Sequence, residues 1–227
     1  MIAILGLANS GCWEGVRTRV NATVLSVQGD VKIVGAASGS TKSLDVRGHC
    51  APNDTIAVAP SSGVAIALLP SVLLSAGPDS ELRILGLSLT KDGDETGSAM
   101  LRREARIQLA RGSICILQER LDVQAQPRLE IETSNGMANS AFDCLFVVRQ
   151  AAGTTEIICV SGTLEFRPKQ GPPVAIEPGH VGIWTATDSR MLRAESTDES
   201  QREFVSALAA EKKMRDLRSQ KTNVFLP

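Results

Sequence analysis

The sequence predicts a mainly β protein with one α-helix near its C-terminal end. Between residues 20 and 184, short apolar segments are broken by Gly, Pro, Asn and Asp about every eight to twelve residues, which is typical of strands joined by turns. No segment in that part has a helical period, whereas residues 198–219 do. The chain of 227 residues is long enough for one large β domain or two smaller units.

Twelve apolar segments are expected to form strands. They are residues 22–27, 31–34, 55–58, 64–69, 80–85, 106–109, 114–117, 129–133, 142–148, 154–160, 163–167 and 174–176. Gly29, Gly112 and Gly162 are each followed by a polar and then an apolar residue, and each is expected to form a tight corner or a bulge. Their spacing is unequal, so we expect an irregular, Gly-punctuated β-sandwich or β-solenoid-like coil instead of a strict repeat.

A polar segment divides the expected strands into two halves. Residues 91–97 are almost entirely charged or small, and Arg102, Arg103, Arg106 and Arg111 follow closely. Such a loop is expected at the surface, so the boundary between the two halves is placed near residues 90–105. The arginines are interpreted as the solvated rim of a strand; binding of an acidic partner or a phosphate is the alternative.

Five cysteines, Cys12, Cys50, Cys115, Cys144 and Cys159, include no C-x-x-C pair and no zinc-type cluster with histidine. The last three lie in apolar segments and are expected to be buried thiols. A three-residue loop ending in Gly153 would place Cys144 opposite another residue and turn Cys159 to the other face of the sheet. A disulfide between them is therefore disfavoured, although the pairing of the four later cysteines stays open.

Residues 198–219 are expected to form the C-terminal helix. Ser196 and Glu199 have the spacing of a capping box, and the segment begins acidic and ends basic. An apolar stripe consists of Phe204, Ala207, Leu208, Ala210, Met214 and Leu217. We expect the stripe to pack on the protein's own domain more readily than on a partner, and the apolar residues 224–226 are a second docking element.

The N-terminal residues suggest export. Residues 2–8 are apolar but too few to span a bilayer, and small residues precede Cys12 as they do in the lipobox of bacterial lipoproteins. Cys12 is therefore a candidate lipidation site, with a short buried strand as the alternative. No basic residue precedes the apolar run, and Asn9 stands where a lipobox prefers Leu.

Composition excludes several partner classes. With 3% aromatic residues and no Tyr, the chain lacks the exposed rings that stack on bases or sugars. A net charge of −1 argues against a nucleic-acid or anionic-membrane partner. No apolar run of about twenty residues is present, so no transmembrane helix is expected.

No group of residues indicates catalysis, a metal or a cofactor. His49 and Cys50 are neighbours on an extended segment and should point to opposite faces, and nothing directs His180 toward a thiol. Glu130 and Glu132 alternate with apolar residues, as on a strand with one wet face. Asp92, Asp94 and Glu95 are similar to a calcium loop, but Arg103 stands where that loop needs its bidentate Glu.

The order of motifs from residue 22 to 184 resembles the FecR domain, a module of bacterial envelope proteins that include iron-transport signalling proteins. The residues that carry the resemblance are 22–31, 44–48 with 53–56, 62–68, 109–114, 131–136, 155–164 and 174–180. Two turn positions at which the family prefers Gly are Asn53 and Asn139, an exchange that positive φ tolerates. The family's sigma-factor-binding region and transmembrane helix have no counterpart in these motifs.

The resemblance implies a domain organisation and a function. Residues 1–19 would be an export or tether segment, residues 20–188 the FecR-like β domain, and residues 189–227 the C-terminal helix and tail. The expected function is non-enzymatic: binding of an envelope protein or cell-wall component in the periplasm, in signalling or regulation, with Cys12 as a membrane tether. The alternative is a structural subunit of an envelope assembly that docks through its C-terminal helix and tail.

Overall fold

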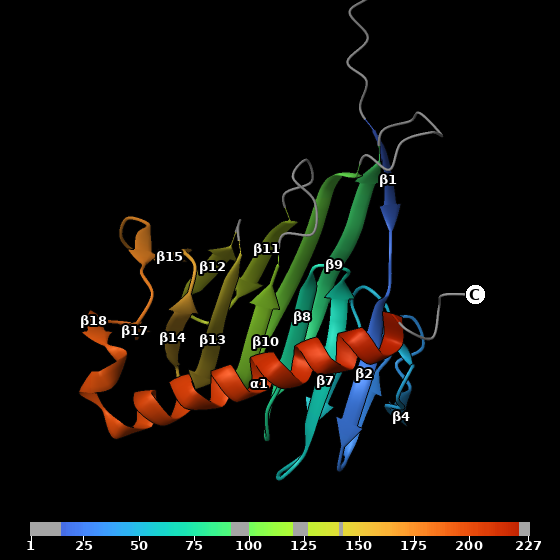
Figure 1. Cartoon of the computed structure of the whole chain (residues 1–227), viewed down its shortest axis with the longest axis horizontal. Coiled ribbons are helices and arrows are strands. Elements are labelled where there is room, and N and C mark those ends of the chain that lie inside the picture. The colour runs from blue at the N-terminus through green and yellow to red at the C-terminus, as the bar shows by residue number, and fades with distance from the viewer. Residues whose placement is uncertain (1–14, 92–99, 120–126, 141–142, 223–227) are drawn as a thin grey trace, which may run out of the picture.

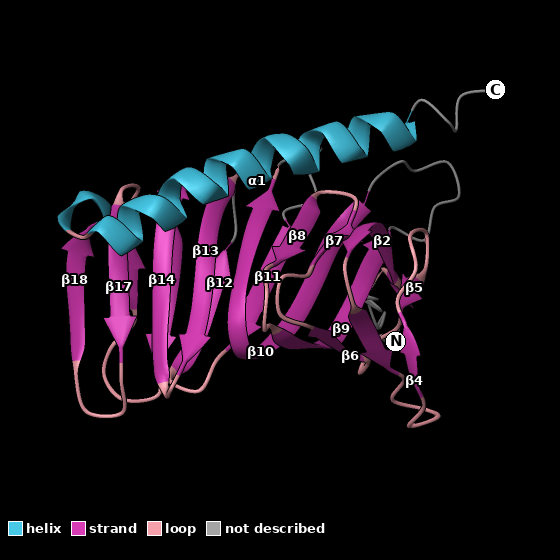
Figure 2. Ribbon diagram, turned by 90° about the horizontal axis from the view of Figure 1, so that it is seen from below, coloured by secondary structure: helices cyan, strands magenta, loops and turns pink. Residues whose placement is uncertain are grey.

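The computed structural model describes residues 15–91, 100–119, 127–140 and 143–222, which form two stacked β-sheets and one long helix (Figures 1 and 2). The elements are β1 (Val16–Arg19), β2 (Ala22–Gln28), β3 (Val31–Val34), β4 (Thr41–Ser43), β5 (His49–Cys50), β6 (Thr55–Val58), β7 (Gly63–Leu69), β8 (Val72–Ala76), β9 (Glu81–Lys91), β10 (Met100–Gln118), β11 (Pro127–Glu132), β12 (Gly136–Ser140), β13 (Cys144–Ala151), β14 (Thr154–Ser161), β15 (Leu164–Pro168), β16 (Val174–Ile176), β17 (His180–Trp184), β18 (Ser189–Arg193), a 3₁₀ turn (Ala194–Ser196) and α1 (Asp198–Thr222). The predicted fold class, mainly β with one C-terminal helix, is confirmed.

The strands form two sheets that share β10. Sheet A has the order β4-β3-β6-β9-β10-β11-β12-β15-β16, with β1 paired to the far end of β9. Sheet B has the order β5-β2-β7-β8-β10-β13-β14-β17-β18. Among the described strands the two ends of each sheet do not pair with each other, so both sheets are open.

The 19 residues of β10 pass from one sheet to the other. Residues 100–111 pair with β9 in sheet A, and residues 112–118 pair with β8 and β13 in sheet B. Pairing with β11 is parallel, whereas the other pairings of β10 are antiparallel. This strand therefore holds the two layers together.

The main core lies between the sheets. It consists of inward-facing Val, Ile, Leu and Ala from both sheets, with Phe146, Phe166, Trp184 and three thiols as filler. The rings of Phe166 and Trp184 pack with their centroids 4.1 Å apart. Aliphatic side chains thus provide the core of a chain that has few aromatic residues.

The expected corners at Gly29, Gly112 and Gly162 are confirmed, and each one lies where the chain moves from one sheet to the other. All three have positive φ, at 75°, 90° and 81°. A Cβ at Gly112 would lie 2.4 Å from the Cα of Ser80, and one at Gly162 would lie 2.1 Å from the carbonyl oxygen of Asp143. These positions need glycine for both conformation and space.

Two serines complete the first two corners in the same way. The amide of Asp30 donates to Ser62 Oγ at 2.9 Å, and the amide of Ser113 donates to Ser80 Oγ at 3.0 Å. The weak recurrence in the sequence therefore marks a repeated structural device, a glycine corner braced by a serine from a neighbouring turn.

The expected three-residue loop between β13 and β14 is wrong. Ala151 pairs with Thr154, which leaves a two-residue loop of Ala152 and Gly153 with φ of 47° and 78°. Two consecutive residues at positive φ are the mark of a tight hairpin turn. The register moves by one residue, so Cys144 and Cys159 both face the core between the sheets, and both are free thiols.

Helix α1 lies across the outer side of sheet B (Figure 2). Ala207 and Met214 are buried there, and Phe204, Ala210 and Leu217 pack beside them, as the apolar stripe predicted. Leu208 is 45% exposed and lies outside the contact, because the helix uses a narrower stripe than expected. The cap lies one residue later than the expected one: Thr197 Oγ1 accepts from the amide of Ser200 at 3.1 Å.

Several predicted features lie outside the described residues: Cys12, the acidic loop with Asp92, Asp94 and Glu95, and the tail at 224–226. Within the described part, no helix has the length and apolar character that crossing a membrane requires.

Candidate functional site

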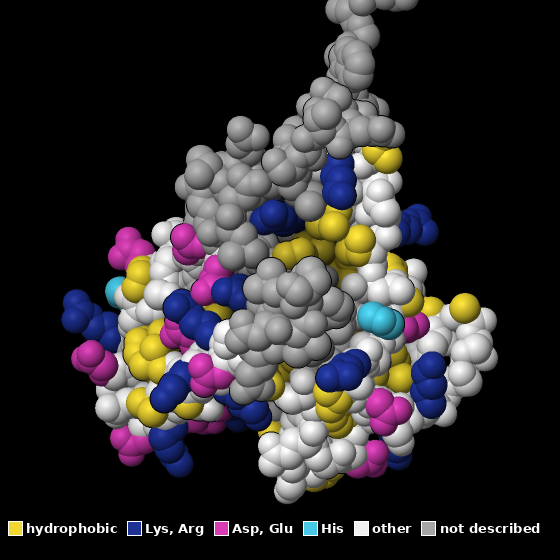
Figure 3. All heavy atoms as spheres, turned by 45° about the vertical axis from the view of Figure 1, so that its right-hand side comes forward, with side chains coloured by type: hydrophobic (Ala, Val, Ile, Leu, Met, Phe, Trp, Pro, Cys, Tyr) yellow, Lys and Arg dark blue, Asp and Glu magenta, His cyan; other side chains and the backbone are white. Residues whose placement is uncertain are grey.

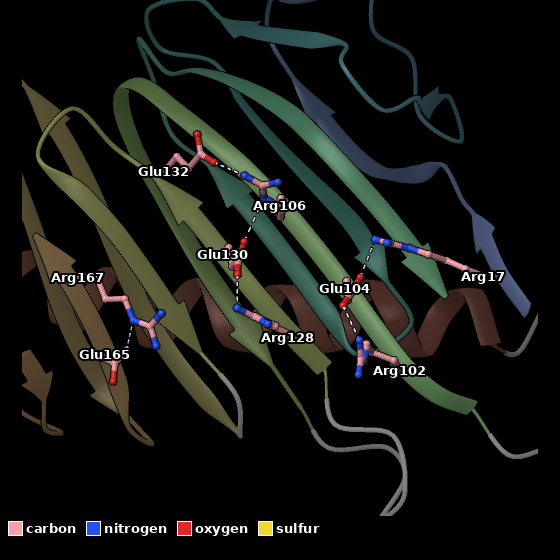
Figure 4. A network of polar contacts seen from close by, with 9 residues as sticks. All are labelled: Arg17, Arg102, Glu104, Arg106, Arg128, Glu130, Glu132, Glu165 and Arg167. Atoms are coloured by element: carbon pink, nitrogen blue, oxygen red, sulfur yellow. Dashed lines mark hydrogen bonds and ion pairs between the residues drawn. The ribbon is translucent and has the colours of Figure 1, made fainter. Parts of the chain in front are cut away.

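The outer faces of the two sheets differ sharply. On sheet B the outer face is apolar: Leu73, Leu117, Leu145 and Val147 join a second core that α1 covers. On sheet A the outer face is charged, and α1 lies on the opposite side of the molecule (Figure 4). A functional surface made of the described strands is therefore best sought on sheet A.

Arginine dominates the outer face of sheet A. Its charged residues on β1, β9, β10, β11 and β15 are Arg17, Arg19, Arg83, Arg102, Arg106, Arg111, Arg128 and Arg167 with Glu81, Glu104, Glu130, Glu132 and Glu165. Eight arginines against five glutamates leave an excess of three positive charges, although the whole chain has a net charge of −1. Acidic and basic side chains also lie close together on the face seen in Figure 3.

Glu104 on β10 contacts side chains of β1 and β9 on this face. Its carboxylate lies 2.7 Å from Arg17 Nη2 on β1 and 3.6 Å from Arg102 Nη1 on its own strand. Ser88 Oγ on β9 donates to the same carboxylate at 3.3 Å and accepts from Arg17 Nε at 3.1 Å. Arg17 therefore reaches across β9, from β1 to β10 (Figure 4).

Arg106 is the centre of a second group. Its Nε lies 3.1 Å from Glu130 and its Nη2 lies 2.6 Å from Glu132, both on β11. Arg128 Nη2 lies 2.8 Å from the other oxygen of Glu130. Leu129 and Ile131, which alternate with these glutamates, are fully buried, so the expected strand with one wet face is confirmed.

A groove of about 540 Å³ lies between these two groups; we call it the β9 groove. Its floor includes the small residues Gly86 and Ser88 of β9, and its sides carry Arg17 and Arg19 from β1 with Glu104 and Arg106 from β10. A bulge at Leu85 shifts the register between β9 and β10 there. Nothing lies within 4 Å of the place a Cβ on Gly86 would occupy, so glycine leaves the floor open.

Two arginines of this face have no carboxylate partner among the described residues. Arg83 Nε donates to the carbonyl oxygen of Asn53 at 3.3 Å, and no ion pair joins Arg19 to any described acid. Arg19 is exposed and lines the β9 groove. The guanidinium groups can bind carboxylates or other oxyanions in a fork geometry, which is the chemistry that this face offers.

The predicted Arg cluster is divided by the alternation of the strand. Arg102, Arg106 and Arg111 point outward on sheet A, whereas Arg103 points inward and is only 7% exposed. The expected solvated rim is therefore wrong in place, because these arginines lie on the face of a sheet and not along its edge. Arg17 and Arg19 belong to the same face but were missed, since only the pairing of β1 with β9 brings them there.

The thiols are not arranged as nucleophiles. Cys50 and His49 lie on opposite faces of β5, with Cys50 fully buried and His49 exposed, as expected. Burial raises the pKa of Cys50, Cys115 and Cys144 to about 12 and that of Cys159 to about 11. Neutral thiols are poor nucleophiles and poor metal ligands. In the part of the chain that the structure describes, no three His, Cys, Asp or Glu side chains gather as metal ligands would.

Comparison with solved structures shows a partial likeness of fold. No family model matches the sequence, and no curated protein matches it. Two crystal structures of a "putative anti-sigma factor" from Parabacteroides distasonis ATCC 8503 align with 61% of this chain at 13% identity and a TM-score of 0.43. The aligned part covers 58% of that protein, less than two thirds of its length, and we transfer neither function nor partner from it.

Proposed function

We propose that this chain is a non-enzymatic protein-binding module that acts in signalling or regulation at the bacterial envelope, and that its partner binds the outer face of sheet A. The observation that carries the proposal is the contrast between the two sheets. Sheet B is covered by α1, whereas the outer face of sheet A presents eight arginines, four of which line an open groove. Arginine is enriched at protein interfaces, where its planar group makes paired hydrogen bonds.

The envelope setting rests on the resemblance of residues 22–184 to the FecR domain. A lipid tether at Cys12 is part of the same proposal, and mass spectrometry of the protein from native cells tests it. A diacylglyceryl group on Cys12 would support the tether. An unmodified segment from Met1 to Cys12 in cytosolic protein would overturn both the tether and the export.

The alternative, docking of the C-terminal helix into an envelope assembly, receives less support. The apolar stripe of α1 is used within the molecule, and the large apolar side chains that the described helix exposes are Val205 and Leu208. A partner that bound through the same stripe would have to displace the helix from sheet B.

Site-specific photo-crosslinking in native cells tests which face binds. A benzophenone amino acid at Met137, on the outer face of sheet A, is expected to give a discrete adduct with one protein. The same group at Leu208, on the exposed side of α1, is the matched control and is expected to give none. Loss of the Met137 adduct in an Arg19→Glu variant would show that the crosslinked protein binds through the arginines of this face. Adducts from Leu208 alone would overturn the proposal and favour docking through the helix.

A further inference from the structure

We infer that the β9 groove binds an extended, acidic segment of the partner protein, with its carboxylates held by the arginines of β1 and β10. This inference rests on the proposed function and names the chemistry of the partner. The occupant is a polypeptide with acidic side chains at alternate positions, and the binding groups are Arg17, Arg19 and Arg106.

The shape of the groove suits an extended chain. Its floor follows one strand, and the outward residues Gly86 and Ser88 are too small to fill it. Long arginine side chains rise on both sides, from β1 and from β10. Arg17 crosses β9 at Ser88 to reach Glu104, so the open part of the groove floor lies at Gly86. A chain extended along the whole strand would displace Arg17 from Glu104.

The spacing of the charges suits a strand-like occupant as well. Arg17 and Arg19 are two residues apart on β1, so their side chains leave the same face about 7 Å apart. Successive side chains on one face of an extended peptide have the same spacing. Acidic residues at positions i and i+2 of the occupant would therefore meet successive arginines.

Glu104 shows what the groove accepts. Its carboxylate is bound by Arg17 Nη2 at 2.7 Å and by Ser88 Oγ at 3.3 Å, with Arg102 Nη1 at 3.6 Å. A carboxylate at the groove wall is thus already bound by guanidinium and hydroxyl groups from three strands. The occupant's first carboxylate would compete with Glu104 for Arg17, and its next one would reach Arg19, which has no carboxylate partner among the described residues.

The same glutamates disfavour a polyanion. Glu104 and Glu130 line the groove together with four arginines, so the field there is mixed in sign. Polyphosphate and nucleic acid bind best to a continuous basic surface. A peptide that places single carboxylates between uncharged residues can contact the arginines without bringing further charge against the glutamates.

Fluorescence anisotropy with the full chain tests the inference. The probe is a fluorescein-labelled peptide of four Glu-Thr repeats, in which Thr favours an extended conformation. The matched control is a peptide of four Gln-Thr repeats. We expect the acidic peptide to bind about tenfold more tightly at low ionic strength, and the difference to shrink as salt is added. Equal binding of the two peptides would overturn the inference.

Three single variants locate the site. Arg19→Gln is expected to weaken binding of the acidic peptide about fivefold, and Glu104→Gln to strengthen it about threefold because Arg17 is released. Arg167→Gln removes an arginine from the same sheet but outside the groove, and should leave the affinity unchanged within about twofold. If Arg167→Gln weakened binding as much as Arg19→Gln, the attraction would be diffuse and the groove would not be the site.

Inorganic polyphosphate is the competing class. If it displaced the peptide at lower charge concentration than unlabelled acidic peptide does, a polyanion would be the better occupant and this inference would fail. The crosslinking test distinguishes failure of the acidic-segment inference from failure of the proposed protein-binding face. Adducts from Met137 together with peptides that do not bind would reject the acidic segment while leaving sheet A as the protein-binding face.

Discussion

The outer faces of sheets A and B are built by the same alternation and differ in what the outward positions carry. In β11 of sheet A, buried Leu129 and Ile131 alternate with Glu130 and Glu132. In β13 of sheet B, residues 144–148 are buried without interruption. A strand that is apolar on both faces needs a second covering layer, and α1 provides it. The uncovered face is therefore the one whose side chains already tolerate water.

The largest effect is expected from a charge placed between α1 and sheet B. Ala207 is 2% exposed in the helix–sheet contact, so Ala207→Glu would bury an unpaired carboxylate. We expect the free energy of unfolding to fall by about 4 kcal/mol. Urea unfolding followed by circular dichroism measures the change.

Ala209→Glu is the matched control for that prediction, because it makes the same exchange on the exposed side of the same helix. It should change the free energy of unfolding by no more than about 0.5 kcal/mol. Equal effects of the two variants would mean that α1 does not rest on sheet B through this face.

The next largest effect is expected at a corner between the sheets. Gly162 and Gly153 have nearly the same φ, 81° and 78°, but only Gly162 is enclosed. Gly162→Ala would suffer both the unfavourable φ and an overlap with Asp143, and should lower the free energy of unfolding by about 3 kcal/mol. Gly153→Ala should cost only the φ term, about 1 kcal/mol.

Urea unfolding of the two glycine variants separates the effect of backbone conformation from the effect of steric overlap. The gap between these glycine variants isolates the close approach of the chain at the corner. If both variants lost the same stability, backbone conformation alone would account for the glycine at the corner, and the crossing between sheets would not be tightly packed.

Much of this fold could be predicted from the sequence, since most strands are apolar segments ended by turn residues. Some strands that were not predicted, such as β1, β4 and β18, are short and largely exposed, so they show no apolar pattern. Strands β8 and β17 were not predicted either, although both are apolar and mostly buried. Strand β10 was predicted as two strands because Gly112 interrupts its apolar run, although the chain only bends there. For the exposed segments, pairing with neighbouring strands and not local composition makes them strands.

The candidate site was only half visible in the sequence. The arginines of β10 were noticed as a cluster, but their partners on β1 and β11 come from distant parts of the chain. Local patterns carry no information about which strands pair across such distances. The alternation along β10 separates inward Arg103 from outward Arg102 and Arg106, but it applies only because residues 100–118 form one continuous strand.

A pH effect of moderate size should distinguish the interior thiols from groups on the open face. Burial raises the pKa of Cys115, beneath α1, from 9.0 to about 12. Above pH 9 the thiol ionises in the unfolded chain but not in the folded one, so the unfolded state binds fewer protons and stability falls as pH rises toward 12. We expect a loss of about 1 kcal/mol per pH unit from this thiol.

Unfolding measured at pH 8, 9 and 10 tests this slope. A Cys115→Ala variant is the control, because it should show a shallower loss between pH 9 and pH 10 than the parent chain. Identical slopes would indicate that Cys115 is accessible to water in the folded state, and hence that α1 does not seal the outer face of sheet B.

The smallest effects are expected from single ion pairs, and they sharpen the contrast between a covered and an open face. Glu119, at the end of β10, lies 3.3 Å from Arg215 and also contacts Arg218, both on α1. Glu165 on sheet A pairs with Arg167 at 2.5 Å, and both side chains are well exposed. Because the Glu119 carboxylate is less exposed and binds two guanidinium groups, Glu119→Gln should lower the free energy of unfolding by about 1 kcal/mol, against about 0.3 kcal/mol for Glu165→Gln.

Added salt should reduce the effect of Glu165→Gln nearly to zero, since exposed ion pairs are screened first. If Glu165→Gln were the more destabilising change, the ion pairs of sheet A would be structural ties, and the arginines there would be less free to exchange partners than binding of an acidic segment requires.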